Sequence, residues 1–394
     1  MTPLPLAAVD RDKPRAFLAT PHGAMAGLFT IYGLGVGLWS GASASVLARA
    51  GVTAPVFGIA MTLFMAAYLA AMSSAGFFGG RFGLRKVLLV GAPLQGIAVA
   101  SLLIAQSSSA IFINMIAFGV FGGLVDLTMN AEGARVERDL SRPILAGLHG
   151  GASSGIAVGA IAGSLIAVNI GSWLSALIAL AAAAGVTAWV FVATPERGVE
   201  RAQESPSGRR ALLTRSLIVL GIVIGISVAG EGAATYWSSL LLQDEAPKLA
   251  AISGLGAAFF CAFQATLRLN ADRVRRLVSD RRLIIVSLAI AALGFVVVAA
   301  HAGFLVTIFG FAIIGLGTGS IMPCGVALAV GHRGFSAAAA LSTVALFGSL
   351  ARLPAPLAMG AIANYFSLSG AFGLFAILLA LGCVGMRFFA PDNS

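Results

Sequence analysis

Apolar runs of membrane-spanning length recur along the whole chain and constrain its fold more than any other feature. A helix needs about 20 apolar residues to cross the roughly 30 Å of hydrocarbon in a bilayer. Lipid offers the backbone no hydrogen-bond partners, and these runs exceed the length of a barrel strand, so they predict transmembrane helices. Twelve runs meet this description, at residues 23–48, 55–80, 86–106, 109–131, 144–169, 172–193, 213–242, 248–270, 283–300, 303–330, 337–361 and 368–390.

The composition agrees with a membrane protein and argues against several other classes. Hydrophobic residues make up 59% and charged residues 10% of the 394 residues, and the mean hydropathy is +0.97. This leaves too little polar surface for a soluble globule, so we expect the lipid bilayer as solvent. The glycines of a GxGxG pattern at Gly33, Gly35 and Gly37 lie within a span, which favours close helix packing over a nucleotide site. The three cysteines have no paired or metal-type spacing.

Basic residues collect on one side of the predicted spans. With the N-terminus inside, all but three of the 25 Lys and Arg residues lie on the cytoplasmic side, the exceptions being Arg49, Lys248 and Arg352. Basic residues near span ends are retained in the cytoplasm. We therefore expect both termini inside, and we attribute the net charge of +10 to anionic headgroups and not to a nucleic acid.

The runs divide into two halves. We expect a cytoplasmic tail at 1–22 without a cleaved signal, a six-helix bundle at 23–193, a cytoplasmic linker at 194–212, a second six-helix bundle at 213–390 and a tail at 391–394. Four residues of spans four and five recur after a shift of 193 in spans ten and eleven, which indicates an internal repeat: Phe118, Gly122, Met129 and Gly155 match Phe311, Gly315, Met322 and Gly348.

One loop carries a family resemblance. The segment GFFGGRFGLRK, from Gly76 to Lys86, resembles the GxxxDRxGRR loop between spans two and three of the major facilitator superfamily. Gly80 stands where the motif has Asp, which implies a weaker inner latch on the first half. The resemblance implies a gating role for the two matching loops, through Gly76, Arg81, Gly83, Arg85, Asp272 and Arg273. Twelve spans in two halves with both termini inside also match the superfamily.

Three further segments, at 126–137, 142–151 and 231–238, are similar to the YbjJ-like branch of bacterial inner-membrane facilitators. This resemblance implies a multi-pass protein of the bacterial inner membrane. It names no substrate.

Small residues form stripes on two of the spans. Residues four apart lie on one helix face, and small faces let helices approach closely. The resemblance implies that spans five and eight meet across the two halves, so we expect their stripes to pack together, either as a rocking surface or as static packing. The stripes consist of Gly151, Gly155, Gly159 and Gly163 in span five and of Ser253, Ala257, Cys261 and Ala265 in span eight.

Four ionisable residues lie deep within spans that, by the resemblance, line or flank a central cavity. Each buried charge costs on the order of 3 kcal/mol, so such residues mark functional sites or pairs. Glu231 and Arg352 lie near the midplane, where they form either a permanent salt bridge or an anion site with a releasable proton acceptor. Asp126 and His149 lie closer to the inner end and form either a polar knot with Asn130 or an inner gate.

Several other residues are candidates for the cavity wall. Tyr32, Trp39, Tyr236 and Trp237 can stack on a solute or fill the core. The sequence around Met322 resembles a break in a cavity-lining helix, and two prolines after Arg352 predict a bend in span eleven.

Together these features predict a secondary active transporter. We expect a monomer, without cofactor or metal, that moves a small polar, anionic solute by alternating access with proton coupling. Two alternatives stay open: an exporter of amphiphilic or drug-like compounds, and a non-transporting receptor or scaffold. We expect no enzyme, because no nucleophile and base recur at a common depth. The sequence does not specify the substrate or the direction of transport.

Overall fold

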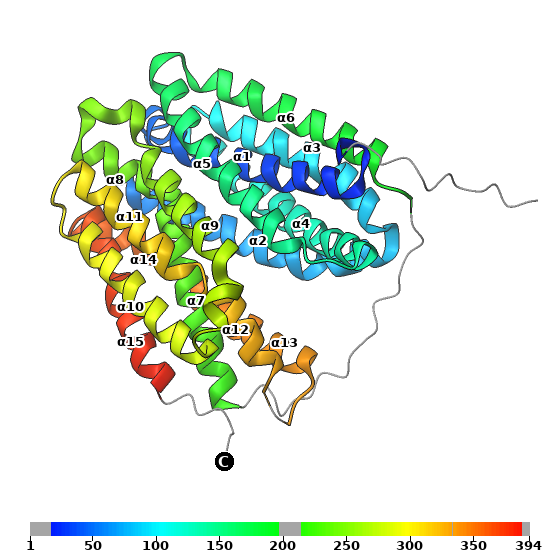
Figure 1. Cartoon of the computed structure of the whole chain (residues 1–394). Helices are drawn as coiled ribbons and strands as arrows, with labels where there is room; N and C mark the ends of the chain where they lie inside the picture. The colour runs from blue at the N-terminus through cyan, green and yellow to red at the C-terminus, as the bar shows by residue number, and fades with distance from the viewer. Residues whose placement is uncertain (1–16, 197–213, 333, 388–394) are drawn as a thin grey trace, which may run out of the picture.

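The chain is built from helices that run back and forth through one bundle (Figure 1). A computed structural model describes residues 17–196, 214–332 and 334–387, apart from the side chains of residues 18, 271 and 272. Two 3-10 turns, η1 (Phe17–Ala19) and η3 (Pro247–Ile252), accompany the α-helices. The helices of the described residues are α1 (Pro21–Arg49), α2 (Ala54–Phe82), α3 (Leu84–Leu103), α4 (Ser108–Leu140), α5 (Leu145–Asn169), α6 (Ser172–Ala193), α7 (Arg215–Tyr236), α8 (Ser238–Glu245), α9 (Leu255–Arg275), α10 (Asp280–Ala299), α11 (Phe304–Thr318), α12 (Ile321–Val330), α13 (Ala337–Arg352), α14 (Ala355–Tyr365) and α15 (Leu368–Arg387).

The predicted all-α membrane fold is confirmed. Within the described residues, eleven helical stretches are long and apolar enough to cross a membrane, with α11–α12 and α13–α14 counted as one stretch each. The short helix α8 is not in this set, and neither is α9, which stands at the position of the eighth predicted span. Gln264, Arg268 and Asn270 make it more polar than the others. Because α9 packs against α5 and α11, neighbouring helices cover part of its polar surface.

Prolines explain the two interrupted spans. A proline lacks an N–H and its ring clashes with the carbonyl four residues earlier, so it ends or bends a helix. Pro323 acts on the carbonyl of Gly319, and α11 gives way to α12 at residues 319–320, a few residues before the position expected from Met322. Pro356 acts on the carbonyl of Arg352, where α13 ends before α14 begins at residue 355.

The helix α4 runs nine residues beyond the predicted end of its span, to Leu140. Its extension holds the next helix in place, because the Glu137 carboxylate accepts hydrogen bonds from the backbone N–H groups of Ile144 and Leu145, at 2.7 and 2.9 Å. These groups belong to the start of α5, which has no side-chain cap of its own. A carboxylate at a helix N-terminus satisfies free N–H groups and complements the helix dipole.

The helices form two groups, α1–α6 and α7–α15, which lie side by side in Figure 1. The end of α6 and the start of α7 lie at one end of the molecule, called here the linker end. The opposite end, where α1 meets α2 and α14 meets α15, is the far end. Residues 197–213 lie outside the described part of the chain, so the exact domain limits at 193 and 213 stay a prediction.

The glycine face of α5 packs against α1, which corrects the pairing expected with span eight. A Cβ added to Gly155 would overlap the Thr30 carbonyl, and one added to Gly159 or Gly163 would overlap the carbonyls of Leu34 or Leu38. The expectation of close packing was right and the partner was wrong. α9 meets another part of α5, where Leu269 contacts Gly150 and where Gly254, just before α9, approaches the Ala160 carbonyl.

The same type of packing joins α7 and α13. A Cβ added to Gly225 would overlap the Gly348 carbonyl, as one added to Gly37 of α1 would overlap the Ile156 carbonyl of α5. Close glycine contacts thus hold both helix pairs, and Gly348 lies against the Gly221 carbonyl as Gly155, its match after the shift of 193, lies against the Thr30 carbonyl. Glycine lets these backbones come closer than any side chain would allow.

The two groups meet closely at the far end. A Cβ on Gly58 of α2 would lie 2.7 Å from the Pro356 carbonyl of α14. Ser40 donates a hydrogen bond to the Thr235 carbonyl, and Ser239 donates one to the Gly41 carbonyl at 3.1 Å. These contacts close the far end.

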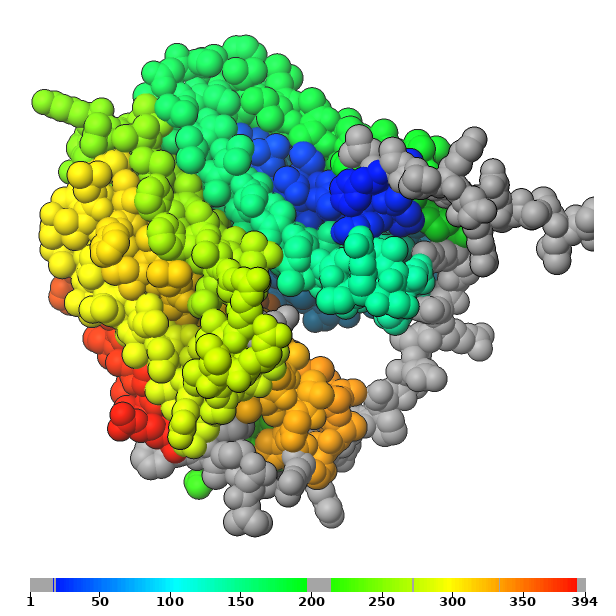
Figure 2. Space-filling model, viewed as in Figure 1, coloured from blue at the N-terminus to red at the C-terminus, as the bar shows by residue number. Residues whose placement is uncertain are grey.

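At the linker end the two groups separate. Figure 2 shows an opening between the region around residues 130–150, in teal, and α12–α13, in orange. Five ion pairs seen between described residues, among them Lys86 with Glu196 and Glu231 with Arg268, each join residues of the same group. The protein is therefore closed at the far end and open at the linker end.

Candidate functional site

A central cavity of about 290 Å³ lies between the two groups of helices. Its walls come from α1, α2, α4 and α5 on one side and from α7, α9 and α13 on the other. All four predicted intramembrane charges line it, namely Asp126, His149, Glu231 and Arg352. Since both groups of helices contribute walls, a solute bound here contacts both at once.

Arg352 extends from the last residue of α13 into this cavity. Its Nε is buried without a hydrogen-bond partner, and no described side chain forms an ion pair or hydrogen bond with it. The C-terminus of a helix favours a cation, but its partial charge does not neutralise a guanidinium. The cavity therefore holds a positive charge that forms no direct ion pair or hydrogen bond with a described side chain, although the carboxylates of Asp126 and Glu231 lie close enough to attract it.

Glu231 pairs with a residue that the sequence did not suggest. Its Oε2 lies 3.2 Å from a terminal guanidinium nitrogen of Arg268, and both side chains are largely buried. The salt bridge considered between Glu231 and Arg352 is thus replaced by one between α7 and α9. Arg268 was assigned to cytoplasmic anchoring, although Cys261, Gln264 and Arg268 share one helix face and all line the cavity.

Asp126 is held by neutral groups. Tyr68 donates a hydrogen bond to Asp126 Oδ2, and Asn130 Nδ2 donates to Asp126 Oδ1 at 3.0 Å. Asn130 also donates to the Asp126 carbonyl, one turn earlier on α4, at 2.8 Å. No described cation lies within ion-pair distance of this carboxylate. Asp126 is therefore a buried carboxyl group that can be either ionised or protonated without breaking a salt bridge.

His149 lines the same cavity but is not hydrogen-bonded to Asp126. Its ring makes an edge contact with Phe29, with centroids 5.2 Å apart. The polar knot expected between α4 and α5 exists in a different form, since Glu137 and not His149 joins the two helices.

The aromatic candidates divide into two sets. Tyr32 and Tyr236 line the central cavity. Trp39 is fully buried in the core, and Trp237 packs against Phe57 at the closed far end, with centroids 4.6 Å apart and the ring planes tilted by 52°. Of the two interpretations given for these tryptophans, the structure favours core packing, because neither ring lines the central cavity.

Three cavity rings were missed, and one expected residue lies elsewhere. Phe64 and Tyr68 line the cavity from α2, one helical turn apart, and Phe260 lines it from α9. Met322 is 40% exposed and does not line the cavity, because the break in this span falls before it. A smaller recess continues past Arg352 toward the far end, lined in part by Met61, Met65 and Met359.

The loops resembling the facilitator motif contact their own half. Gly83, at a φ of 87°, forms the turn between α2 and α3. Arg85 donates a hydrogen bond to the Phe191 carbonyl at 2.7 Å, and Arg81 lies over the neighbouring Phe82 ring. Gly76 has open space beside it. In the second half, Arg273 donates to Asn270, while the side chain of Asp272 lies outside the described part of the structure.

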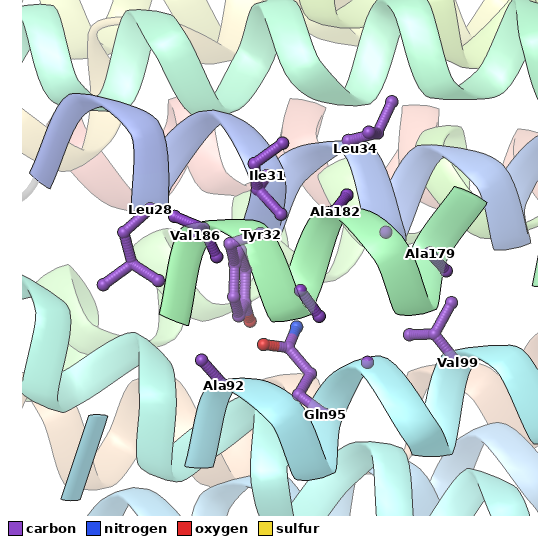
Figure 3. Close-up of a pocket in the computed structure, with 13 residues that line it drawn as sticks. Leu28, Ile31, Tyr32, Leu34, Ala92, Gln95, Val99, Ala179, Ala182 and Val186 are labelled. Atoms are coloured by element: carbon purple, nitrogen blue, oxygen red, sulfur yellow. The ribbon is translucent and has the colours of Figure 1, made fainter. Parts of the chain in front are cut away.

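A separate small pocket lies among α1, α3 and α6 (Figure 3). Gln95 of α3 is 4% exposed, and its amide points into this pocket without a hydrogen bond to any described residue. Tyr32 lines both this pocket and the central cavity.

The fold and the cavity define a multi-pass membrane transporter. Residues 23–278 match the Major Facilitator Superfamily, and the chain belongs to this family of secondary transporters. An uncharacterised MFS-type transporter of Yersinia pestis is 25% identical over 352 residues, covering 89% of this chain and 91% of its own. Membrane protein MosC of Rhizobium meliloti is 26% identical over 69% of this chain and 65% of its own.

The solved structures add support for the fold. A crystal structure of a mutant of the nucleoside transporter NupG superposes with a TM-score of 0.77, covering 94% of this chain and 100% of the other at 11% identity. At this identity the similarity concerns the arrangement of helices and not the substrate.

Proposed function

We propose that this protein moves a small anionic solute across the bacterial inner membrane by alternating access, coupled to protons. The observation that carries the proposal is Arg352, a cation without a partner inside a cavity between the two groups of helices. A buried unpaired charge is expensive in a membrane, and an anionic solute would neutralise it with charge-assisted hydrogen bonds. A solute in this cavity would contact both groups of helices at once, which suits a solute whose binding couples their movement.

The distribution of basic residues between the two ends of the helices supports assigning the structure to one state of the transport cycle. With both termini cytoplasmic, as we propose, the open linker end faces the cytoplasm and the far end faces outward. The structure then corresponds to an inward-open state of a monomer. We assign the chain to the YbjJ-like branch on the three segments described above.

Asp126 is the group we assign to proton coupling. It lines the same cavity as Arg352, on the opposite group of helices, and its hydrogen-bond partners are uncharged. A protonated Asp126 with an anion on Arg352 would leave both charges compensated, whereas an ionised Asp126 would favour the empty site. Proton and anion would thus bind together.

The experiment that tests the proposal is ligand-dependent thermal stabilisation of the purified protein. Carboxylates, phosphates, neutral nucleosides and lipophilic cations are screened at two pH values, since a ligand stabilises by RT ln(1 + [L]/Kd). We expect stabilisation by an anion, more at the lower pH, and its loss in Arg352→Gln. Arg282→Gln, a change at an exposed residue outside the cavity, is the matched control.

Two other functions give different outcomes. Stabilisation by lipophilic cations that persists in Arg352→Gln would replace the proposal with export of amphiphilic compounds. Saturable anion binding without flux into proteoliposomes would indicate a receptor or scaffold.

A further inference from the structure

The walls of the central cavity are rich in aromatic rings. Five rings line it, from four helices: Tyr32, Phe64, Tyr68, Tyr236 and Phe260. Phe64 of α2 and Tyr236 of α7 touch each other across the two groups of helices, with centroids 5.7 Å apart and planes at 67°. The aromatic wall is therefore continuous between the two groups.

The three tyrosines differ in how their hydroxyl groups are used. Tyr68 donates to Asp126, and Tyr32 makes a long contact of 3.5 Å with the Gly122 carbonyl. The hydroxyl of Tyr236 has no hydrogen bond to any described residue. A tyrosine in an apolar environment normally finds a partner, so a bound solute is the natural partner for this hydroxyl.

The charges of the cavity limit the charge of the solute. Arg268 is occupied by Glu231, and Asp126 is held by Tyr68 and Asn130. Arg352 is the cation left over among the described cavity residues. One guanidinium binds one carboxylate in a two-pronged geometry, so the site suits a single negative charge.

We infer that the solute is a planar aromatic monoanion whose acidic group binds Arg352 and whose ring packs against Tyr236 and the neighbouring rings. Aromatic pairs attract each other in edge-to-face or offset arrangements beyond what area burial provides. An aliphatic anion of the same size would fill the cavity without this gain. The inference rests on the proposed function and specifies that the anionic solute carries an aromatic ring.

Three matched compounds test the ring and the charge separately. Phenylacetate has both, cyclohexylacetate has the charge without the aromatic ring, and 2-phenylethanol has the ring without the charge. Affinities are measured by calorimetry on the whole purified protein. We expect phenylacetate to bind about fivefold more tightly than cyclohexylacetate and 2-phenylethanol to bind most weakly.

Substitutions at Tyr236 and Arg352 test which side chains cause the preference for the aromatic carboxylate. Tyr236→Leu should remove the preference for phenylacetate while keeping the binding of cyclohexylacetate. Tyr236→Phe should keep the preference, which guards against a folding defect in the leucine variant. Tyr365→Leu, a change at a residue that is 80% exposed, should alter nothing. Arg352→Gln should weaken the binding of both carboxylates, phenylacetate and cyclohexylacetate, about tenfold or more.

The outcomes distinguish the inference from the proposed function. Equal affinity for the two carboxylates overturns the aromatic inference and leaves the anion site standing. Equal affinity for 2-phenylethanol and phenylacetate overturns the role of Arg352, and with it the proposed function. If none of the three binds, the aromatic inference fails, and the carboxylate and phosphate screen decides the proposed function independently.

Discussion

Glu231 and Arg268 form an ion pair at 3.2 Å between α7 and α9, and this pair leaves Arg352 without a partner. The three residues line one cavity, so the arginine with which Glu231 pairs determines which guanidinium is left for a solute to contact. Had Glu231 paired with Arg352, the cavity would present Arg268 instead, closer to the linker end.

Removing Arg268 should destabilise the protein more than removing the whole pair. Arg268→Gln leaves the Glu231 carboxylate buried without a cation, whereas the double variant with Glu231→Gln leaves two neutral amides. We expect the single variant to lose about 2 kcal/mol or more, and the double-mutant cycle to give a coupling of about 1–3 kcal/mol. Thermal unfolding in detergent measures both. Additive effects would contradict a pair that stabilises the fold.

Glu137 should stabilise the start of α5. Glu137→Ala removes the acceptor of two backbone hydrogen bonds, so we expect a loss of about 1–2 kcal/mol. Glu196→Ala is the control, because its pair with Lys86 is exposed and contributes little. Equal unfolding temperatures for the two variants would rule out the capping role.

Gln95→Leu should raise stability. The change removes a buried amide that has no described hydrogen-bond partner and fills the pocket of Figure 3 with an apolar side chain, a gain of about 1 kcal/mol. In contrast, Gln264→Leu removes a hydrogen bond that Gln264 donates to Thr318 at 3.1 Å, and we expect it to destabilise. A destabilised Gln95→Leu variant would point to a bound water or ligand at the amide.

Bulk at Gly58 should open the far end. Gly58→Leu places a side chain where α2 meets α14, so we expect the balance to shift toward a state open at this end. A cysteine at Ser239, which is buried at the far end, reports the change through faster labelling by a maleimide. Gly185→Leu in α6 serves as control, because a Cβ there meets open space. Unchanged labelling in Gly58→Leu would mean that this contact does not hold the far end closed.

Asp126→Asn should abolish the proton-driven accumulation of solute while leaving solute exchange across the membrane intact. Asparagine mimics the protonated carboxyl group but cannot release a proton, so we expect solute exchange to continue and to lose its dependence on pH. Accumulation driven by a proton gradient should disappear. Flux into proteoliposomes with and without a gradient measures both, and gradient-driven accumulation by the variant would exclude Asp126 as the coupling group.

The positions of the helices were predictable because the signal is local. Length and hydropathy of a run decide whether it can cross a bilayer, and most predicted ends fall within a few residues of the observed ones. The extension of α4 past residue 131 was missed, since a helix whose backbone bonds are internal can continue into the polar region without an apolar signal.

The site was predictable only in part. Buried charges in apolar runs stand out, so Asp126, His149, Glu231 and Arg352 were found from the sequence, and all of them line the cavity. Arg268 was missed because it lies near the end of α9, among other arginines that anchor a helix at the membrane surface. The polar stripe that Gln264 forms with Arg268 was the available signal.

The sequence by itself determined the membrane environment, the order of the helices and four of the charges that line the cavity, because each depends on neighbouring residues along the chain. The tertiary structure decided the pairs: Glu231 with Arg268 and not Arg352, and the glycine face of α5 with α1 and not α9. A face of small residues or a buried charge in the sequence indicates that a packing or ionic partner exists, but it does not identify that partner. The partner is chosen by which helices pack together, and that depends on contacts between residues far apart in the chain.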